Sequence, residues 1–427
     1  MSLHRTVILG EGLGKPAALN LSARIPELDG LRGFAILFVV LFHYAYFPDE
    51  PGSPLLVHIR SLFSLGWTGV DLFFVLSGFL IGGILLDAKA SPNYFKTFYT
   101  RRFFRIIPIY YLWIASFIFL ITLGGRVLQA HSNSHVLPPL GFTVYEQFFF
   151  IQNIWRPPFE GHTAWWLGVT WSLAVEEQFY LVAPLLIRFL KVAKLRVLLV
   201  LVVFTAPLLR TLLYFVEKSP AYHAYESTPC RADALALGVL AAVYWRNESF
   251  RAWLSRREGA LTILVAVLFA GMLVMGHWYS NPYSGIVLTA GVSWVGLFYA
   301  AVLLLTLQRP AGFIAGLART KWLRELGRVS YCVYLIHTAV SYALFALLNR
   351  TLPHLTNLRT LGITLLSAAL TYLIARLSWI FVEGPLVRIG HRTTYADGSA
   401  GAPPSVASTP TESGEGGDFS SPEVARP

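Results

Sequence analysis

The sequence predicts an all-α integral membrane protein, a bundle of about ten transmembrane helices with both termini in the cytoplasm. Hydrophobic residues make up 55% of the 427 residues and charged residues only 13%, about half of their share in a soluble domain. A soluble protein of this composition would leave large apolar patches in water and would aggregate. The basic residues also lie in short clusters between the apolar runs, as they do in proteins that span a bilayer.

Each predicted helix is an apolar run close to the length that crosses a bilayer, about 20 residues. In chain order the runs are residues 33–48, 66–86, 105–123, 168–187, 197–216, 231–245, 260–278, 284–307, 329–348 and 360–382. A further apolar and aromatic stretch, 142–155, is too short to be a span. It is interpreted as an interfacial or re-entrant segment on the outer side of the membrane.

The distribution of Lys and Arg predicts the orientation. With the N-terminus in the cytoplasm, 25 of the 34 Lys and Arg residues fall in cytoplasmic segments and 7 in outer segments, while Arg210 and Arg376 fall within spans. This asymmetry follows the positive-inside rule and favours an even number of spans. The net charge of +11 therefore reflects topology, so the lipid bilayer, and no nucleic acid, is the expected partner of the chain.

The chain is expected to have three parts. Residues 1–25 form a cytoplasmic tail, 26–390 the membrane domain, and 391–427 a cytoplasmic tail that is rich in Ser, Pro, Gly and Glu. The second tail lacks apolar periodicity and is predicted to be disordered. Cys230 and Cys332 fall in different helices, so a disulfide framework is not expected.

Ionisable residues within the predicted spans are the first functional signal. A charged side chain near the middle of a bilayer costs about 3 kcal/mol, so each needs a partner or a function. Arg32 and His43 are eleven residues apart, which puts them on one helix face at a separation of about 16 Å. They would line one interior channel, or they are a snorkelling arginine and a hydrogen-bonded packing histidine.

The predicted topology gathers His43, Asp71, Glu176 and Asp233 in the outer half of the membrane and places Arg32 at the cytoplasmic edge. Asp71 and Asp233 begin their helices, so stabilising a helix N-terminus is an alternative role for both. Glu176 lies beyond the first turn. A carboxylate beside an imidazole orients it and raises its basicity, so Glu176 or Asp71 is expected to assist His43.

Two polar stripes follow helical spacing in the apolar runs. One consists of Ser172, Glu176 and Tyr180, and the other of Ser330, Tyr334 and His337. Two helical histidines without further ligands at a metal-binding spacing make a poor metal site, so no metal is expected.

Seven segments of the chain, in order, resemble the bacterial membrane acyltransferase family three. They are RIPELDGLRGFAILFVVLFHY (24–44), with Arg32 and His43 in an Arg-x10-His pattern, GWTGVDLFFVLSGFLI (66–81), RRFFRIIPIYYL (101–112), WSLAVEEQFYLVAP (171–184), CRADALALG (230–238), GRVSYCVYLIH (327–337) and VEGP (382–385). The resemblance covers about Arg24 to Arg388. It implies a membrane-bound O-acyltransferase of the stand-alone type, without a fused esterase-like domain.

The resemblance also implies an acyl-CoA donor, most simply acetyl-CoA, and no bound cofactor. It carries the catalytic role to His43 and makes Arg32 the second functional residue of that pair. With these, the catalytic candidates are His43, Glu176 and Asp71, and the substrate-binding candidates are Arg32, Arg102, Arg105, Arg231, Asp233 and His337.

The basic cluster Arg101, Arg102 and Arg105 is expected to face the cytosol, where it would attract the phosphates of the donor. The alternative is that these residues serve topology alone. His43 would act as general base on an acceptor hydroxyl, or would itself be acylated and pass the group outward. The sequence leaves both schemes open.

The acceptor is expected to be a hydroxyl of a glycan or of a small molecule such as a macrolide-type metabolite, and the membrane to be the cytoplasmic one. The outer segment 124–167, with His131 and His135, is either an acceptor lid or an interfacial aromatic belt. Two other functions use the same residue types. One is a transporter or permease with intramembrane His and carboxylates, and the other is a scaffold with charges joining its helices.

Overall fold

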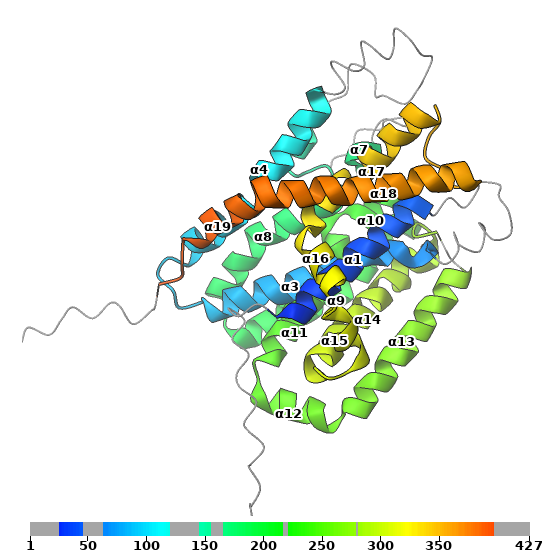
Figure 1. Ribbon diagram of the computed structural model, residues 1–427. Coiled ribbons are helices and arrows are strands. Elements are labelled where there is room, and N and C mark those ends of the chain that lie inside the picture. The colour runs from blue at the N-terminus through cyan, green and yellow to red at the C-terminus, as the bar shows by residue number, and fades with distance from the viewer. Residues whose placement is uncertain are drawn as a thin grey trace, which may run out of the picture.

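The computed structural model describes residues 25–45, 63–119, 145–154, 165–216, 221–278 and 281–396, and these contain helices and turns but no strand. The long helices are α1 (Pro26–Ala45), α3 (Gly69–Asp87), α4 (Tyr94–Phe119), α8 (Trp171–Phe189), α9 (Val192–Thr211), α11 (Thr228–Trp245), α13 (Glu258–Trp278), α14 (Val292–Gln308), α17 (Ser330–Leu348) and α18 (Leu358–Ser378). The short ones are α6 (Tyr145–Phe148), α7 (Trp165–Gly168), α10 (Ala221–Glu226), α12 (Glu248–Arg256), α15 (Phe313–Ala318), α16 (Lys321–Arg328) and α19 (Gly384–His391). Figure 1 shows the arrangement.

Each predicted span corresponds to one long helix. Eight helices in the described part of the chain are long and apolar enough to cross a membrane, which confirms a multi-spanning helical bundle. The two predicted spans outside this set are 168–187 and 231–245, which correspond to α8 and α11. These two helices carry the buried or cavity-lining charges described below, so they are the least hydrophobic of the predicted spans.

Several boundaries differ from the predictions. Helix α4 begins at Tyr94 rather than near 105, because the aromatic and basic stretch before 105 continues the helix although its hydropathy is low. Helix α1 begins at Pro26, since proline suits the first turn of a helix. Helix α18 continues through the π-helical turn η6 (Trp379–Glu383) into α19, so the last helix reaches His391. The predicted ends 46–48 and 120–123 lie outside the described residues.

Three further segments, one 3-10 and two π-helical, extend the long helices. Segment η1 (Ser64–Thr68) precedes α3, η4 (Leu212–Val216) follows α9, and η5 (Val287–Gly291) precedes α14. Within the stretch interpreted as interfacial or re-entrant, residues 145–154 form only the single turn α6 and following turns. They are held to α4 because the Tyr110 and Tyr111 hydroxyls donate to the carbonyls of Gln147 and Phe148.

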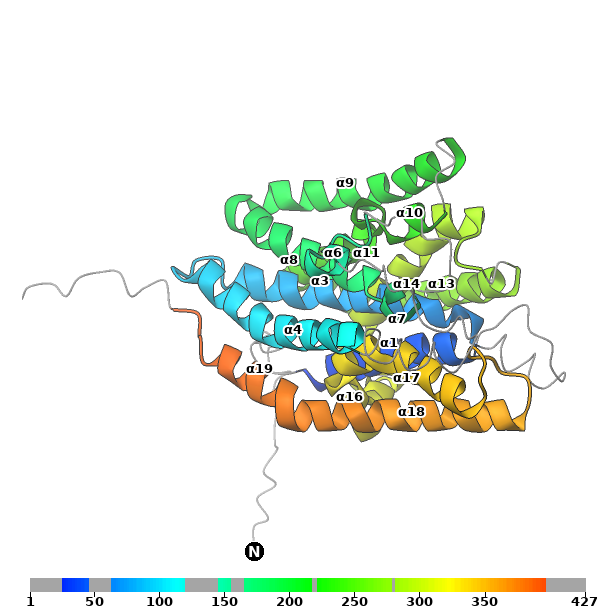
Figure 2. The same cartoon turned by 90° about the horizontal axis from the view of Figure 1, so that it is seen from above.

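The helices are stacked with α3 in the interior and α9 and α18 on opposite outer flanks (Figure 2). Of the most apolar 18 residues within 64–87, 72% are buried, whereas for the corresponding residues of 192–216 and 358–391 the share is 17%. The outer helices expose large apolar side chains such as Phe204 and Phe381. Exposed apolar surface on this scale suits lipid rather than water.

Glycines bring the central helices close together. A Cβ added to Gly78 of α3 would lie 2.1 Å from the carbonyl oxygen of Leu235, and one added to Gly238 of α11 would lie 2.2 Å from that of Val75. Small residues at such crossings let helix backbones approach closely in membrane proteins. This packing fixes α3 and α11 as the centre around which the polar side chains are placed.

The first residues of the predicted C-terminal tail are packed against α4. Asn93 Nδ2 donates to the Thr394 carbonyl, Arg101 Nε donates to the Thr393 carbonyl, and the Ala396 amide donates to Asn93 Oδ1. The rest of that tail, 397–427, the N-terminal residues 1–24 and the segment with His131 and His135 lie outside the described residues.

Candidate functional site

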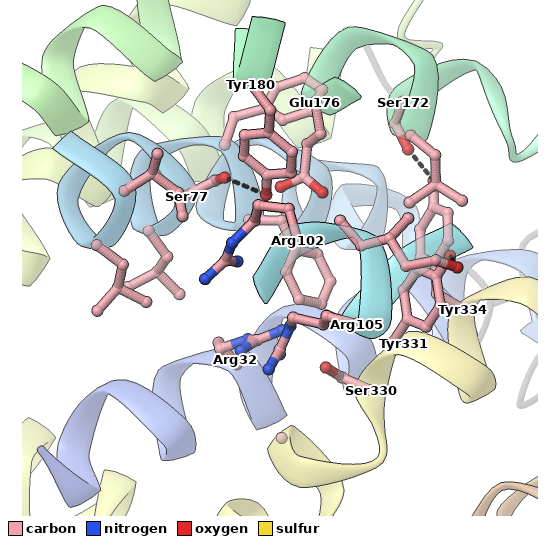
Figure 3. Close-up of a pocket in the computed structure, with 18 of the residues that line it drawn as sticks. Arg32, Ser77, Arg102, Arg105, Ser172, Glu176, Tyr180, Ser330, Tyr331 and Tyr334 are labelled. Carbon is pink, nitrogen blue, oxygen red and sulfur yellow. Dashed lines mark hydrogen bonds between the residues drawn. The ribbon is translucent and has the colours of Figure 1, made fainter. Parts of the chain in front are cut away.

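A cavity of about 460 Å³ opens between α1, α3, α4, α8 and α17. Its volume is within the range of small-molecule sites. We call it the arginine cavity because four arginines line it: Arg32, Arg102, Arg105 and Arg328. Figure 3 shows three of these guanidinium groups approaching one another from α1 and α4. The structure therefore brings together three of the predicted substrate-binding residues, Arg32, Arg102 and Arg105.

The arginines are available to a ligand. Within the described part of the chain, neither Arg32 nor Arg105 makes a hydrogen bond or ion pair, and Arg102 Nε is buried without a hydrogen-bond partner. The Arg102 guanidinium lies 5.8 Å from the centre of the Tyr180 ring, which holds it in place without using its donors. A buried donor without a partner is destabilising, so these groups favour an anionic ligand.

Carboxylates face the arginines across the cavity. Glu176 lines it and interacts electrostatically with Arg32, Arg105 and Arg102. Asp29 and Glu177 also line it. Four arginines against three carboxylates leave an excess of positive charge among the lining side chains, if all are ionised. Glu176 thus belongs to the arginine cavity and not to the surroundings of His43.

Both predicted polar stripes contribute to the wall. Ser172, Glu176 and Tyr180 all line the cavity, as do Ser330 and Tyr334. The Tyr180 and Ser77 hydroxyls are 2.9 Å apart, and the Ser172 and Tyr334 hydroxyls 2.5 Å apart (Figure 3). The Tyr334 hydroxyl also donates to the Val169 carbonyl at 2.8 Å. The last member of the second stripe, His337, does not line the cavity but lies one turn further along α17.

His337 is the neighbour of His43. His337 Nε2 lies 3.3 Å from His43 Nδ1, and the two ring centres are 4.9 Å apart. The Tyr44 hydroxyl donates to the His337 carbonyl at 2.7 Å and so ties α1 to α17 beside the pair. His337 is fully buried and His43 partly buried. The contact partner of His43 in the described chain is thus a histidine, whereas Glu176 or Asp71 was predicted.

Asp71, Arg231 and Asp233 lie elsewhere, in buried ion pairs. Arg231 Nη2 donates to Asp71 Oδ1 at 2.8 Å, and Arg210 Nη2 donates to Asp233 Oδ2 at 2.9 Å. The Ser293 hydroxyl donates to the same Asp233 oxygen at 2.6 Å. All four charged side chains are at most 1% exposed, and none of them lines the arginine cavity.

These pairs connect α3 to α11 and α9 to both α11 and α14. Asp71 and Asp233 each bond to an arginine of another helix, a contact that the sequence did not predict. Removing one member of a buried ion pair leaves an uncompensated charge, at a cost of about 3–5 kcal/mol. Arg231 is also covered by the Tyr225 ring, 4.8 Å from its guanidinium carbon. The observed geometry supports a structural role for these residues.

His43, Asp71, Glu176 and Asp233, all predicted for the outer half of the membrane, do not form one contact group. Their contacts fall into three sets: the histidine pair, the two buried ion pairs and the arginine cavity. The physical reason is the depth of α8, whose first turn already meets Tyr334 through Ser172. Glu176, one turn later, reaches the level of Arg32 near the start of α1.

Sequence reasoning missed three contributors. Arg328 is not among the predicted substrate-binding residues, yet it lines the cavity and is held by Glu325 at 2.8 Å. His391 was placed in a disordered tail, but it ends α19 and lines the cavity. Arg210 was visible as a lone arginine in an apolar run, and that signal alone could have predicted its buried carboxylate partner. No group of three or more His, Cys, Asp or Glu side chains in the described ranges could hold a metal ion.

Curated bacterial proteins are similar to this chain over most of its length. The chain is 28% identical over 382 residues to the Peptidoglycan O-acetyltransferase OatA of Listeria monocytogenes, covering 86% of this chain and 56% of the relative. It is 29% identical over 384 residues to the Putative peptidoglycan O-acetyltransferase YrhL of Bacillus subtilis, with the same coverage of both chains. The chain thus spans a little over half the length of these curated relatives. No solved structure matches it significantly.

The family comparison covers most of the membrane region. Residues 25–376 match the model of the family described as acyltransferase domain. The matched range contains Arg32, both histidines of the pair, and the α4 and α8 walls of the arginine cavity. The resemblance expected from the sequence is confirmed: the chain belongs to the acyltransferase domain family.

Proposed function

We propose that this chain is a membrane O-acyltransferase that moves an acyl group, most simply acetyl, from acyl-CoA to a hydroxyl of a glycan. The observation that carries the proposal is the arginine cavity, which holds the unpaired Arg102 Nε and is lined by Tyr334, whose ring centre lies 5.9 Å from that of His337. The names of the relatives, which are peptidoglycan O-acetyltransferases, support the acetyl group and the glycan. A small-molecule acceptor remains the alternative that the site chemistry also permits.

The charge of the cavity supports an acyl-CoA donor. Coenzyme A carries several phosphate charges, and arginine binds phosphate oxygens through two parallel N–H groups. Arg102 and Arg105 are three residues apart on α4, so both side chains project from one face toward Arg32. We place the phosphates among these arginines at the cytoplasmic mouth, in the cytoplasmic membrane. The pantetheine arm then extends along Ser172 and Tyr334 toward the histidine pair.

The chemistry is assigned to His43. As general base, His43 takes the proton of the acceptor hydroxyl while that oxygen attacks the thioester carbonyl. The new ester C–O bond forms, the C–S bond breaks, and the proton passes from the imidazole to the leaving thiolate. In the other scheme His43 attacks first, holds the acyl group on its ring nitrogen, and gives it to the hydroxyl in a second step. Both schemes end in the same ester and free thiol.

The test is acetyl transfer by the purified chain in lipid nanodiscs, using radiolabelled acetyl-CoA and soluble peptidoglycan fragments. Wild-type protein should form ester-linked acetyl groups that mild alkali releases. His43→Ala should form none while still binding acetyl-CoA, because the arginine cavity is intact. A wild-type-like rate in His43→Ala would contradict the catalytic assignment. Uptake of label by sealed vesicles without any acetylated product would favour the transporter instead.

A further inference from the structure

The hydrogen bonds of the histidine pair indicate which ring nitrogens carry a proton. His43 and His337 come from α1 and α17, and neither lines the arginine cavity. Three carbonyl oxygens surround the two rings. Since a carbonyl oxygen only accepts hydrogen bonds, its contacts determine which ring nitrogens carry hydrogen.

The protonation of His337 follows from its own helix. His337 Nδ1 lies 2.8 Å from the Tyr334 carbonyl and 3.1 Å from the Val333 carbonyl. Nδ1 must therefore be the N–H. In the neutral imidazole, Nε2 then holds a lone pair. This lone pair belongs to the atom that lies 3.3 Å from His43.

The same reasoning fixes His43. Its Nδ1 lies 2.8 Å from the Val39 carbonyl and 3.3 Å from His337 Nε2, and both of these atoms are acceptors. His43 Nδ1 is therefore also an N–H. The only ring nitrogen of His43 that can accept a proton or attack a carbonyl is Nε2. The opposite tautomer would place lone pair against lone pair at both contacts.

We propose that His337 is a positioning residue for His43. Its Nε2 accepts the Nδ1–H of His43 and, together with the Val39 carbonyl, holds His43 in the tautomer whose Nε2 is free to react. This proposal rests on the proposed function, and it replaces the substrate-binding role expected for His337 from the sequence. The complete burial of His337, in contrast to the partial exposure of His43, argues against contact with the donor.

Hydrogen bonds around the histidine pair fix the position of His337. The Tyr44 hydroxyl, next in sequence to His43, donates to the His337 backbone carbonyl at 2.7 Å and lies 2.9 Å from the Thr371 hydroxyl. The helix that carries the reacting histidine is thereby fixed to the helix that carries its partner. When His43 Nε2 takes a proton, Nδ1–H keeps both acceptors and its hydrogen bonds become charge-assisted, which strengthens them.

Two substitutions separate positioning from packing. The amide of His337→Gln reaches roughly as far as imidazole Nε2, so it can still offer His43 an oxygen acceptor. The amide of His337→Asn ends near the position of Nδ1, so it can still donate to the Tyr334 carbonyl but offers His43 nothing. Both replacements are neutral amides, and His354→Asn serves as a control because that histidine is only partly buried and its hydrogen bonds are local.

With radiolabelled acetyl-CoA and peptidoglycan fragments, His337→Asn should lower turnover about 10- to 100-fold, the usual effect of losing a group that orients a functional histidine. His337→Gln should retain most of the turnover, and the acetyl-CoA dissociation constant should be unchanged in both. Equal loss in the two variants would indicate mere packing. A weaker dissociation constant in His337→Asn would indicate direct donor contact. Either result overturns the proposal.

A second experiment measures the tautomer of His43 directly. It depends neither on a folded variant at position 337 nor on a turnover assay. In wild-type protein labelled with ¹⁵N-histidine, the signals of His43 are identified by their loss in His43→Ala. The Nδ1 shift should be that of a protonated nitrogen and the Nε2 shift that of an unprotonated one. The reverse pattern would overturn the tautomer. Failure of the wild-type chain to bind acetyl-CoA would instead refute the proposed function and leave this result standing.

Discussion

At the scale of single residues, charge alone does not reveal what an arginine is for. Arg101 and Arg102 are adjacent in one basic cluster, of which Arg102 is a predicted substrate-binding residue and Arg101 is not. In the structure, Arg101 Nε donates to the Thr393 carbonyl at 2.9 Å and its guanidinium lies over the Tyr395 ring, whereas Arg102 lines the arginine cavity with an unpaired Nε. The two residues form a matched pair for testing the donor site.

We expect Arg102→Gln to weaken binding of acetyl-CoA by about tenfold or more, because a hydrogen bond to a charged group contributes about 1.5–3 kcal/mol. Arg101→Gln removes the same formal charge but should leave the affinity within about twofold. Titration of both purified variants with acetyl-CoA measures the difference. Equal weakening would mean that the cluster attracts the donor only by net charge.

At the scale of elements, helix packing depends on positions that carry no side chain. Gly78 of α3 faces the Leu235 carbonyl oxygen of α11 so closely that an added Cβ would lie 2.1 Å from it, whereas a Cβ at Gly362 of α18 would meet nothing within 4 Å. Both glycines lie inside helices, where alanine is intrinsically favoured by about 1 kcal/mol. The two positions therefore predict changes of opposite sign.

Gly78→Ala should lower the midpoint of thermal unfolding in detergent, since forcing the α3 and α11 backbones apart costs about 1–3 kcal/mol or more. Gly362→Ala should leave the midpoint unchanged or raise it. Fluorescence-monitored melting of the two variants checks the expectation. A stable Gly78→Ala protein would show that the α3–α11 contact is not tight in solution.

Element boundaries show why hydropathy was an incomplete guide. The start of α4 and the segment η6–α19 were missed because their apolar content is diluted by basic residues such as Lys96 and Arg388. These helical turns lie at the predicted cytoplasmic side, where a helix continues beyond the lipid and no longer needs to be apolar. The same turns contribute Arg102 and His391 to the cavity. The helical segments that hydropathy failed to predict therefore belong to the site.

At the scale of the whole molecule, the orientation in the membrane remains a prediction of charge asymmetry. It places α12, between α11 and α13, in the cytoplasm and the turn between α17 and α18 outside. Ser255 of α12 and Thr351 of that turn are both exposed. The two native cysteines are free and buried, so they need not be removed from a labelling experiment.

In intact cells, a membrane-impermeant maleimide should label Thr351→Cys and should not label Ser255→Cys. After permeabilisation both variants should react, which controls for the accessibility of each site. Gel shift of the labelled chain is a sufficient measurement. Labelling of Ser255→Cys alone in intact cells would show that the bundle has the opposite orientation. The mouth of the arginine cavity would then face away from cytosolic acyl-CoA.

The sequence by itself determined the class of protein, since apolar runs of spanning length and basic clusters between them leave few alternatives to a helical bundle in a membrane. It also selected the ionisable residues, because charge is costly in lipid wherever the fold places it. Which charges meet was decided only by the tertiary structure. Helical spacing relates residues within one helix, such as Arg32 to His43, but it says nothing of the depth at which a second helix begins. The first turn of α8 lies at the level of Tyr334, so Glu176, one turn later, lies among the arginines of the cavity. Helix α17 crosses α1 one turn beyond Tyr334. The partner of His43 is therefore His337 and not a carboxylate.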